Sequence, residues 1–208
     1  AAPGYVNRLL NAGWKVAICD QLEAPTTGKL VKRGITRILT PGTAIEDSQL
    51  NSRRGNYLLA LYGDKSGWHA SWLDISTSDF RLASEPTLNN LLPILYAINP
   101  REVLMPEGLE IPEDDRMALE TFLEGRALTR LPDWNFDSSS GLRLVSQVLS
   151  VHGLAGFGIR DSHPALGAAG AVLGYVTDSL CERPKNLYKI SEINFGATVL
   201  LDAASAKN

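Results

Sequence analysis

Asp74 and Asp79 are the residues whose type and spacing come closest to a reactive pair. They flank a predicted turn between two strands, and Glu102 is a possible third carboxylate. Converging carboxylates of this kind hold the divalent metal ions that nucleases use to hydrolyse phosphodiester bonds. Such a site would need further acidic residues from other strands and a helix, and the neighbours of Glu102 do not supply them. The competing interpretation is that Asp74 caps the turn and that Asp79 is solvated.

Other residue types that carry chemistry show no useful spacing. His69, His152 and His163 are not spaced as metal ligands and are predicted to be surface or capping residues. Cys19 and Cys181 fit neither a disulfide framework nor a zinc site, so we predict two buried thiols in a reducing compartment. The sequence has neither a Gly-x-x-x-x-Gly-Lys-Ser/Thr phosphate loop nor a Gly-x-Ser-x-Gly nucleophile motif. No catalytic residue and no metal site is therefore predicted.

Composition is that of an ordinary globular protein. The 208 residues are 44% hydrophobic and 21% charged, with a mean hydropathy of −0.06. These values argue against disorder and predict one or two domains. The longest apolar run, residues 91–98, is far shorter than the roughly 20 residues of a membrane-spanning helix. A signal peptide is not expected, because the sequence shows no basic leading region and no cleavage-site pattern.

Charge divides the chain unequally. Residues 1–54 hold eight Lys and Arg against four acidic residues, whereas the remainder holds 12 against 19. Lys29, Lys32, Arg33 and Arg37 fall on or beside a predicted loop and strand. Basic side chains on such a surface can neutralise nucleic-acid phosphates without reading sequence. The alternative is that they are solvated surface residues.

Hydrophobic periodicity and turn residues predict an α/β fold. A helix ends near Gly13, two short strands follow, and a polar linker covers residues 44–54. Beyond it we predict a three-stranded meander and then alternating helices and strands. The expected strands are 57–62, 68–75, 80–83, 102–105 and 127–131, and the expected helices are 86–98, 113–124, 138–149, 162–181 and 198–208. Gly170 and Gly174 predict close helix packing within the fourth of these helices.

Five segments resemble one known family. They are 16–23 (VAICDQLE), 36–43 (TRILTPGT), 73–80 (LDISTSDF), 153–158 (GLAGFG) and 201–208 (LDAASAKN). Together they span nearly the whole chain and resemble the MutS family of DNA mismatch-repair proteins, in which they occur in the same order.

The resemblance implies how the fold is organised. Residues 55–182 would be a connector domain with an RNase H-like fold, a mixed sheet flanked by helices, without nuclease chemistry. Residues 1–50 would be the C-terminal part of a small α/β mismatch-recognition domain. Residues 183–208 would be a linker and the start of the core or lever domain. The family's mismatch-reading Phe-x-Glu is expected upstream of these residues and its Walker motifs downstream.

The resemblance also implies a function. The complete protein would bind mismatched double-stranded DNA and couple it to ATP-dependent signalling to a MutL-type protein. It would be a cytoplasmic, bacterial homodimer, nucleoid-associated during repair and without a membrane partner. ATP and Mg²⁺ would bind outside these residues, so this chain would be no enzyme and would hold no cofactor.

The resemblance assigns two kinds of binding residue to this chain. Lys29, Lys32, Arg33 and Arg37 would contact the DNA backbone. The predicted helix 138–149 and the following loop would face the partner, through residues Arg143, Leu144 and Gln147. Two alternatives remain open at this point: an RNase H-like, metal-dependent nuclease using Asp74, Asp79 and Glu102, and a module that binds only proteins.

Overall fold

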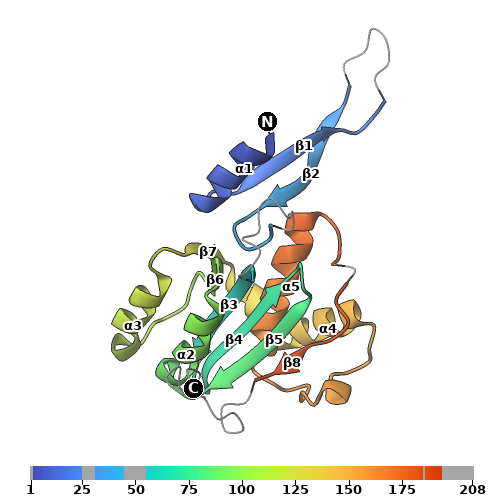
Figure 1. The fold of residues 1–208 in the computed structure, drawn as a ribbon. Coiled ribbons are helices and arrows are strands. Elements are labelled where there is room, and N and C mark those ends of the chain that lie inside the picture. Colours follow the sequence, from blue (N-terminus) through green and yellow to red (C-terminus); the bar gives the residue numbers. More distant parts are fainter. Residues whose placement is uncertain (1, 25–30, 45–54, 185, 194–208) are drawn as a thin grey trace, which may run out of the picture.

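A small N-terminal unit and a larger unit built on a six-stranded sheet follow each other along the chain (Figure 1). The computed structural model describes residues 2–24, 31–44, 55–184 and 186–193. We call residues 2–44 the N-terminal unit and residues 55–193 the sheet unit. The expected helix at 198–208 lies outside the described residues.

The N-terminal unit is one helix packed on an antiparallel strand pair. Helix α1 (Ala2–Asn11) leads into β1 (Val16–Gln21), which pairs with β2 (Arg33–Leu39). Buried Leu10 and Leu39 join Ala44 in a small hydrophobic cluster that holds the helix against the sheet. The predicted helix and both strands are confirmed.

The sheet unit contains the predicted meander. Strands β3 (Tyr57–Asp64), β4 (Gly67–Asp74) and β5 (Asp79–Glu85) are antiparallel neighbours. Strands β6 (Glu102–Pro106) and β7 (Ala127–Leu131) continue the sheet parallel to β3, and the short β8 (Ser191–Glu192) runs parallel to β5. The strand order is β7-β6-β3-β4-β5-β8, so the predicted mixed sheet is confirmed.

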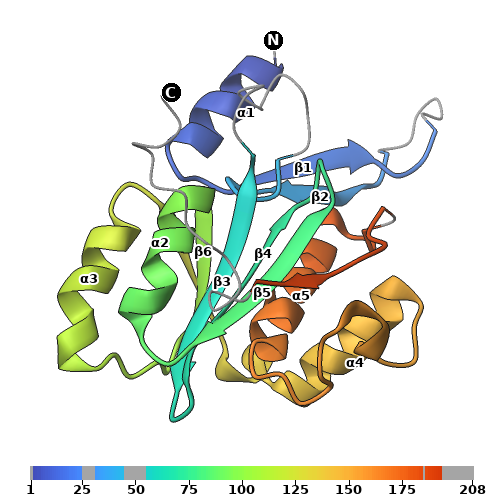
Figure 2. The same ribbon diagram turned by 60° about the horizontal axis from the view of Figure 1, so that its bottom comes forward.

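Helices cover both faces of this sheet, as Figure 2 shows. On one face lie α2 (Leu88–Ile98) and α3 (Glu113–Leu123), and on the other α4 (Ser138–Leu149) and α5 (Leu166–Leu180). Two single-turn 3-10 helices, η1 (Asp133–Phe136) and η2 (Ala155–Phe157), lie in the connections. The mixed α/β class is therefore confirmed.

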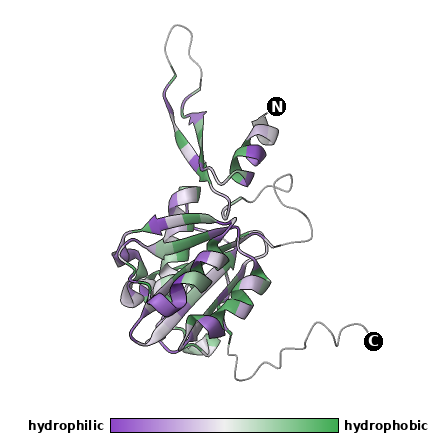
Figure 3. Ribbon diagram, turned by 90° about the vertical axis from the view of Figure 1, so that its left-hand side faces the viewer, coloured by the Kyte–Doolittle hydropathy of each residue, from purple (hydrophilic) through white to green (hydrophobic). Residues whose placement is uncertain are grey.

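Strand β3 is buried on both faces, which explains its nearly continuous apolar sequence. Because successive side chains of a strand point to opposite faces, Leu58 and Ala60 pack in the α4–α5 core. Leu59 and Leu61 pack in the α2–α3 core. Figure 3 shows this apolar interior as green strands between helices with mixed surfaces.

Helices α4 and α5 pack backbone against backbone. A Cβ atom added at Gly170 would lie 2.6 Å from Gly141 Cα, and one added at Gly141 would overlap the Leu166 carbonyl oxygen. A Cβ added at Gly174 would meet only Leu144 Cδ2, at 4.0 Å. The predicted close packing is thus confirmed at Gly170, whereas Gly174 does not require it.

The start of α5 differs from the sequence prediction. The helix begins at Leu166, four residues after the predicted Ser162 cap. Pro164 explains the delay, because a proline disfavours helical geometry in the residue before it. The ring of His163 replaces the missing side-chain cap, since its Nδ1 accepts the Ala165 N–H at 3.2 Å.

The histidine and cysteine predictions are partly wrong. Cys19 and Cys181 are both exposed, because the first lies on the outer face of β1 and the second caps the end of α5. His69 is buried and bonded to Asp64 Oδ1 at 3.0 Å, so it is neither a surface nor a capping residue. His152 is exposed, as predicted.

Among the described residues, none of the helices combines the length and apolar character needed to cross a bilayer.

Candidate functional site

The two units meet at a tight turn, residues 40–43, that leaves β2. Thr40 N–H donates to Thr43 Oγ1 at 3.0 Å, the two hydroxyls are 2.9 Å apart, and Thr43 N–H donates to the Thr40 carbonyl at 3.2 Å. Both threonines are buried. These hydrogen bonds hold the turn in one conformation.

Glu102 fastens this turn to the sheet unit. Its side chain is 0% exposed, and Oε2 accepts the Gly42 N–H at 3.0 Å. Oε1 accepts the hydroxyls of Thr129, at 2.8 Å, and Tyr175, at 2.6 Å. The carboxylate therefore joins the turn to β7 and α5. We call Glu102, Gly42, Thr129 and Tyr175 the junction latch.

The residues around the junction latch are closely packed. A Cβ atom on Gly42 would lie 2.9 Å from Leu58 Cδ1 and 3.0 Å from Glu102 Cβ, so the turn sits directly on the sheet. Burial, together with the neighbouring Glu102 charge, raises the pKa of Tyr175, which keeps its hydroxyl a donor at neutral pH. The Lys15 ammonium lies 5.2 Å from the centre of the Tyr175 ring, a further contact across the junction.

A second anchor holds the start of β3. Asn56 Nδ2 donates to the Ala44 carbonyl at 3.0 Å, and Asn56 N–H donates to Asp74 Oδ2 at 3.0 Å. Asp74 Oδ1 accepts the Ser76 N–H at 2.9 Å and its hydroxyl at 2.6 Å. The predicted turn-capping role of Asp74 is confirmed.

Asp79 is paired rather than solvated, which corrects the prediction made for it. Its Oδ2 accepts the Tyr57 hydroxyl at 2.9 Å, and its Oδ1 accepts Arg81 Nε–H at 2.6 Å. Burial, the hydrogen bond to Asp79 and its charge raise the pKa of Tyr57 to about 12.

The structure does not bring Asp74, Asp79 and Glu102 together as a metal-binding set. Asp74 and Asp79 are opposite one another on β4 and β5, but Glu102 belongs to the junction latch on β6. Within residues 2–24, 31–44, 55–184 and 186–193, no group of three or more His, Cys, Asp or Glu side chains is arranged to hold a metal ion. The sequence interpretation missed Glu102 as a junction residue. Its only signal was a carboxylate at the head of an apolar strand.

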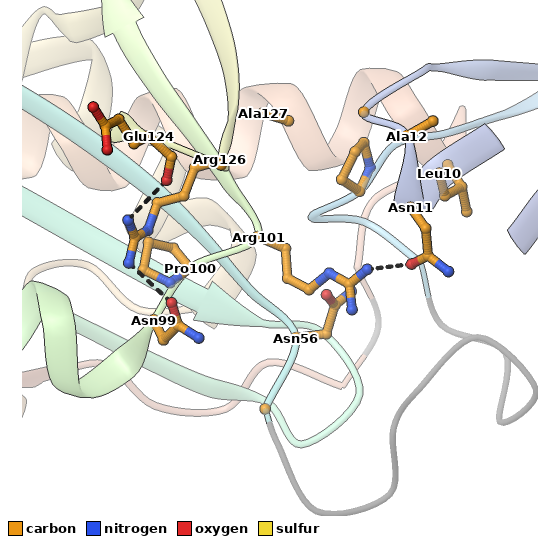
Figure 4. Close-up of a pocket in the computed structure, with 14 residues that line it drawn as sticks. Leu10, Asn11, Ala12, Asn56, Asn99, Pro100, Arg101, Glu124, Arg126 and Ala127 are labelled. Atoms are coloured by element: carbon orange, nitrogen blue, oxygen red, sulfur yellow. Dashed lines mark hydrogen bonds between the residues drawn. The ribbon is translucent and has the colours of Figure 1, made fainter. Parts of the chain in front are cut away.

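A cleft of about 580 Å³ lies beside the latch, between the end of α1 and the ends of α2 and α3 (Figure 4). Arg101 donates from Nη2 to Asn11 Oδ1 across it, so a charged hydrogen bond links the two units at the surface. Arg126 donates to the Phe122 carbonyl and, at 2.9 Å, to Asn99 Oδ1. Arg126 thus binds a carbonyl at the C-terminal end of α3 and the side chain that caps α2, positions at which the helix dipoles favour a cation.

The predicted DNA-backbone residues lie on or beside the strand pair. Lys32, Arg33 and Arg37 are exposed, while Lys29 lies outside the described residues. Arg33 is paired with Gln21 and Arg37 with Ile18, and a register shift in the β1–β2 pairing separates these two pairs. This strand pair projects away from the sheet unit in Figure 1, which leaves the two guanidinium groups accessible.

The predicted partner residues lie on α4. Arg143 and Gln147 are exposed and occupy one face of the helix, since they are four residues apart. Leu144 is half-buried against the α4–α5 core. With its amide oxygen turned toward Arg183, Gln147 accepts two guanidinium N–H groups at 3.2 Å. Arg183 therefore belongs to the same surface, which the sequence interpretation missed.

Phe122, Leu123 and Glu124 form a Phe-x-Glu tripeptide, but it has no exposed aromatic ring. Phe122 is buried between α2 and α3, with its ring 5.3 Å from that of Tyr96. A ring held in the core cannot insert into DNA.

Comparison with known proteins places the chain in a family. The family model described as MutS domain II matches residues 56–191, and that described as MutS domain I matches residues 1–48. The chain is 35% identical over 213 residues to the DNA mismatch repair protein MutS of Chlorobium phaeovibrioides, covering 100% of the chain and 24% of that protein. For the same protein of Syntrophobacter fumaroxidans the identity is 34% over 211 residues, covering 100% and 23%. The chain spans about a quarter of the length of these relatives, and it belongs to the MutS family of DNA mismatch-repair proteins.

Proposed function

We propose that this chain is a binding and coupling part of a mismatch-repair protein, with no catalytic centre of its own. Its N-terminal unit would hold the backbone of mismatched duplex DNA, and its sheet unit would relay that event to a MutL-type partner. The observation that carries the proposal is the junction latch. Through it a single buried carboxylate ties the turn that follows the cationic strand β2 to helix α5, against which the proposed partner helix α4 packs.

The chemistry of the strand pair supports phosphate contact rather than sequence reading. Arg33 and Arg37 are exposed guanidinium groups, and within the described part of the chain neither forms an ion pair with a carboxylate. Guanidinium groups form bidentate hydrogen bonds with phosphate oxygens and displace counterions from the DNA. The binding affinity that they contribute therefore falls as the salt concentration rises. Mismatch discrimination would come from an aromatic wedge elsewhere in the complete protein, since unstacking is easiest at a mispaired step.

The complete protein would supply the remaining functions. We propose that ATP and Mg²⁺ bind outside these residues, that the complete protein is a homodimer and that it acts in the cytoplasm. The domain limits would be 1–50, 55–182 and 183–208. An RNase H-like fold for the connector is supported by its mixed sheet with helices on both faces.

The proposed DNA binding is tested by its salt dependence. The double variant Arg33→Gln/Arg37→Gln is expected to bind a fluorescein-labelled mismatched duplex more weakly. The slope of log K against log salt should become shallower by about 0.9 for each phosphate that is no longer neutralised. Fluorescence anisotropy from 20 to 200 mM salt gives this slope.

The control for this test is Arg116→Gln, which removes an exposed arginine of α3 that pairs with Glu113. It should leave the slope unchanged. If the unaltered chain shows no salt-sensitive binding even at 20 mM salt, the N-terminal unit makes no backbone contact and the chain is a protein-binding module only.

The partner surface is tested in the complete protein. The double variant Arg143→Glu/Gln147→Ala should weaken binding of a MutL-type protein by about tenfold, or ~1.4 kcal/mol. The reason is that it removes both exposed side chains from one face of α4 and reverses the charge of one of them. Biolayer interferometry measures this affinity. Arg116→Glu, which places the same charge change on α3, should bind normally, and equal weakening in both variants would remove α4 from the interface.

A further inference from the structure

A second pocket, of about 580 Å³, opens at the end of the sheet opposite the junction. It lies between the β3–β4 turn, the loop that follows β6, and η1. Its apolar lining comes from Tyr62, Trp68, Pro106, Leu109, Pro112 and Phe136. The pocket lies at the far end of β3 from Asn56, so it is separate from the junction cleft, and its lining contains none of the residues proposed above for DNA or for the α4 face.

The floor of this pocket is preformed. Tyr62 donates its hydroxyl to the Pro164 carbonyl at 2.6 Å, and Trp68 Nε1–H donates to Asp115 Oδ2 at 2.9 Å. The rings of Tyr62 and Phe136 meet edge to face, with centroids 5.6 Å apart. Because the polar tips already have partners, the rings offer apolar surface in fixed positions, which lowers the ordering cost of binding.

An exposed tryptophan stands beside the pocket. Trp134 belongs to the same short helix as Phe136 and is 75% exposed. Exposed tryptophans next to an apolar pocket are typical of protein interfaces, where tryptophan is among the residues that contribute most binding energy. Trp134 is thus an exposed aromatic side chain on the short helix that supplies Asp133 and Phe136 to the pocket.

The rim of the pocket is acidic. Residues 106–115 contain five acidic residues and no basic one. Asp64, Glu110 and Asp133 line the pocket, and among its described lining residues Lys65 is the one cation. Although burial acts to raise the pKa of Asp64, hydrogen bonds from Ser66 and His69 lower it below its ordinary value, so this carboxylate stays charged. Such a rim repels nucleic acid and attracts cationic side chains.

We propose that this pocket is a docking site for a segment of a partner protein that carries arginine or lysine beside an apolar residue. The apolar side chain would pack on the aromatic floor and against Trp134. The cationic side chain would lie against Glu110 and Asp133. The sign of the charge selects a protein segment over DNA, and it distinguishes this surface from the cationic strand β2.

The four tryptophans make the test direct. The ¹⁵N-labelled 208-residue chain is titrated with the peptide acetyl-Phe-Arg-Leu-Arg-amide, and the four indole N–H signals are followed by NMR. Trp68 and Trp134 should shift along a saturating curve. Trp14, which is exposed in the N-terminal unit, and Trp72, which is buried in the sheet, should not respond.

Variants separate charge from shape. Glu110→Gln/Asp133→Asn should weaken binding by about tenfold, because it removes two negative charges from the rim. Asp133 Oδ1 accepts the Gly108 N–H at 2.8 Å, and an asparagine amide oxygen at this position would still accept it. The matched control Glu120→Gln/Glu124→Gln removes two exposed carboxylates that neither line the pocket nor belong to residues 106–115, and it should bind as the unaltered chain does. Trp134→Ala, an exposed change, should also weaken binding.

Three outcomes would overturn the proposal. The first is an equal response to acetyl-Phe-Glu-Leu-Glu-amide. The second is a shift that does not saturate or that affects all four indoles alike. The third is a short DNA duplex that perturbs Trp68 and Trp134, which would assign the surface to nucleic acid.

Discussion

Gly141→Ala is expected to destabilise the sheet unit by about 3 kcal/mol or more, a large part of the 5–15 kcal/mol that holds a typical domain together. The added Cβ would overlap the Leu166 carbonyl oxygen, which belongs to the backbone of α5. Overpacking ordinarily costs about 1–3 kcal/mol, because side chains can move aside. Here backbone meets backbone, so α4 and α5 would have to separate. Urea unfolding followed by circular dichroism measures the change.

Gly174→Ala is the matched control for this prediction. Gly174 is also a glycine of α5, but its added Cβ would meet only Leu144 Cδ2 at 4.0 Å. Alanine in a helix interior is more favourable than glycine by up to about 1 kcal/mol, so this variant should be slightly stabilised. Equal urea midpoints for the two variants would show that the helices are not packed as tightly as described.

Glu102→Ala is expected to lower stability by about 3–5 kcal/mol. It leaves the Gly42 N–H and the Thr129 and Tyr175 hydroxyls without their shared acceptor in a buried place. Each unsatisfied buried group costs about 1–3 kcal/mol, and partial relaxation makes the sum smaller than the simple total. Urea unfolding gives the overall change in stability, and hydrogen exchange at the Gly42 amide shows whether the turn has been released.

Two further variants separate the latch from a general loss of packing. Glu102→Gln should be milder, since its oxygen can accept the Gly42 N–H while its NH₂ faces hydroxyls that can turn to accept. Glu107→Ala removes an exposed carboxylate just beyond the same strand and should change stability by less than about 0.5 kcal/mol. Slow exchange at Gly42 in Glu102→Ala would mean that the turn is held by other contacts.

Local patterns predicted the elements well. A continuous apolar run and the turn residues between strands identified the meander β3–β5, and the apolar face of residues 138–149 identified α4 with the observed limits. These signals lie within a few neighbouring residues, where backbone geometry sets the period. The start of α5 was missed because Pro164 overrides the helical periodicity around it.

Long-range contacts could not be predicted in the same way. Glu102 forms hydrogen bonds with Gly42 and Tyr175, which are 60 and 73 positions away in the sequence. A local sequence pattern does not indicate contacts between residues so far apart. As a lone carboxylate Glu102 looked like a metal ligand, and only the fold shows it as a buried acceptor. The exposure of Cys19 was missed for a similar reason, since it depends on how the other elements pack around β1.

Strand β3 connects the two ends of the sheet unit. Asn56 anchors it at the junction, and its other end carries Tyr62 and Asp64 into the acidic pocket. An eight-residue strand is about 24 Å long, and paired on both sides it behaves as a rigid rod. A tilt of about 5° at the pivot would therefore swing the distant end by about 2 Å. A tilt of the N-terminal unit at this pivot would thus be carried to the opposite surface by the strand itself, without unfolding anything between.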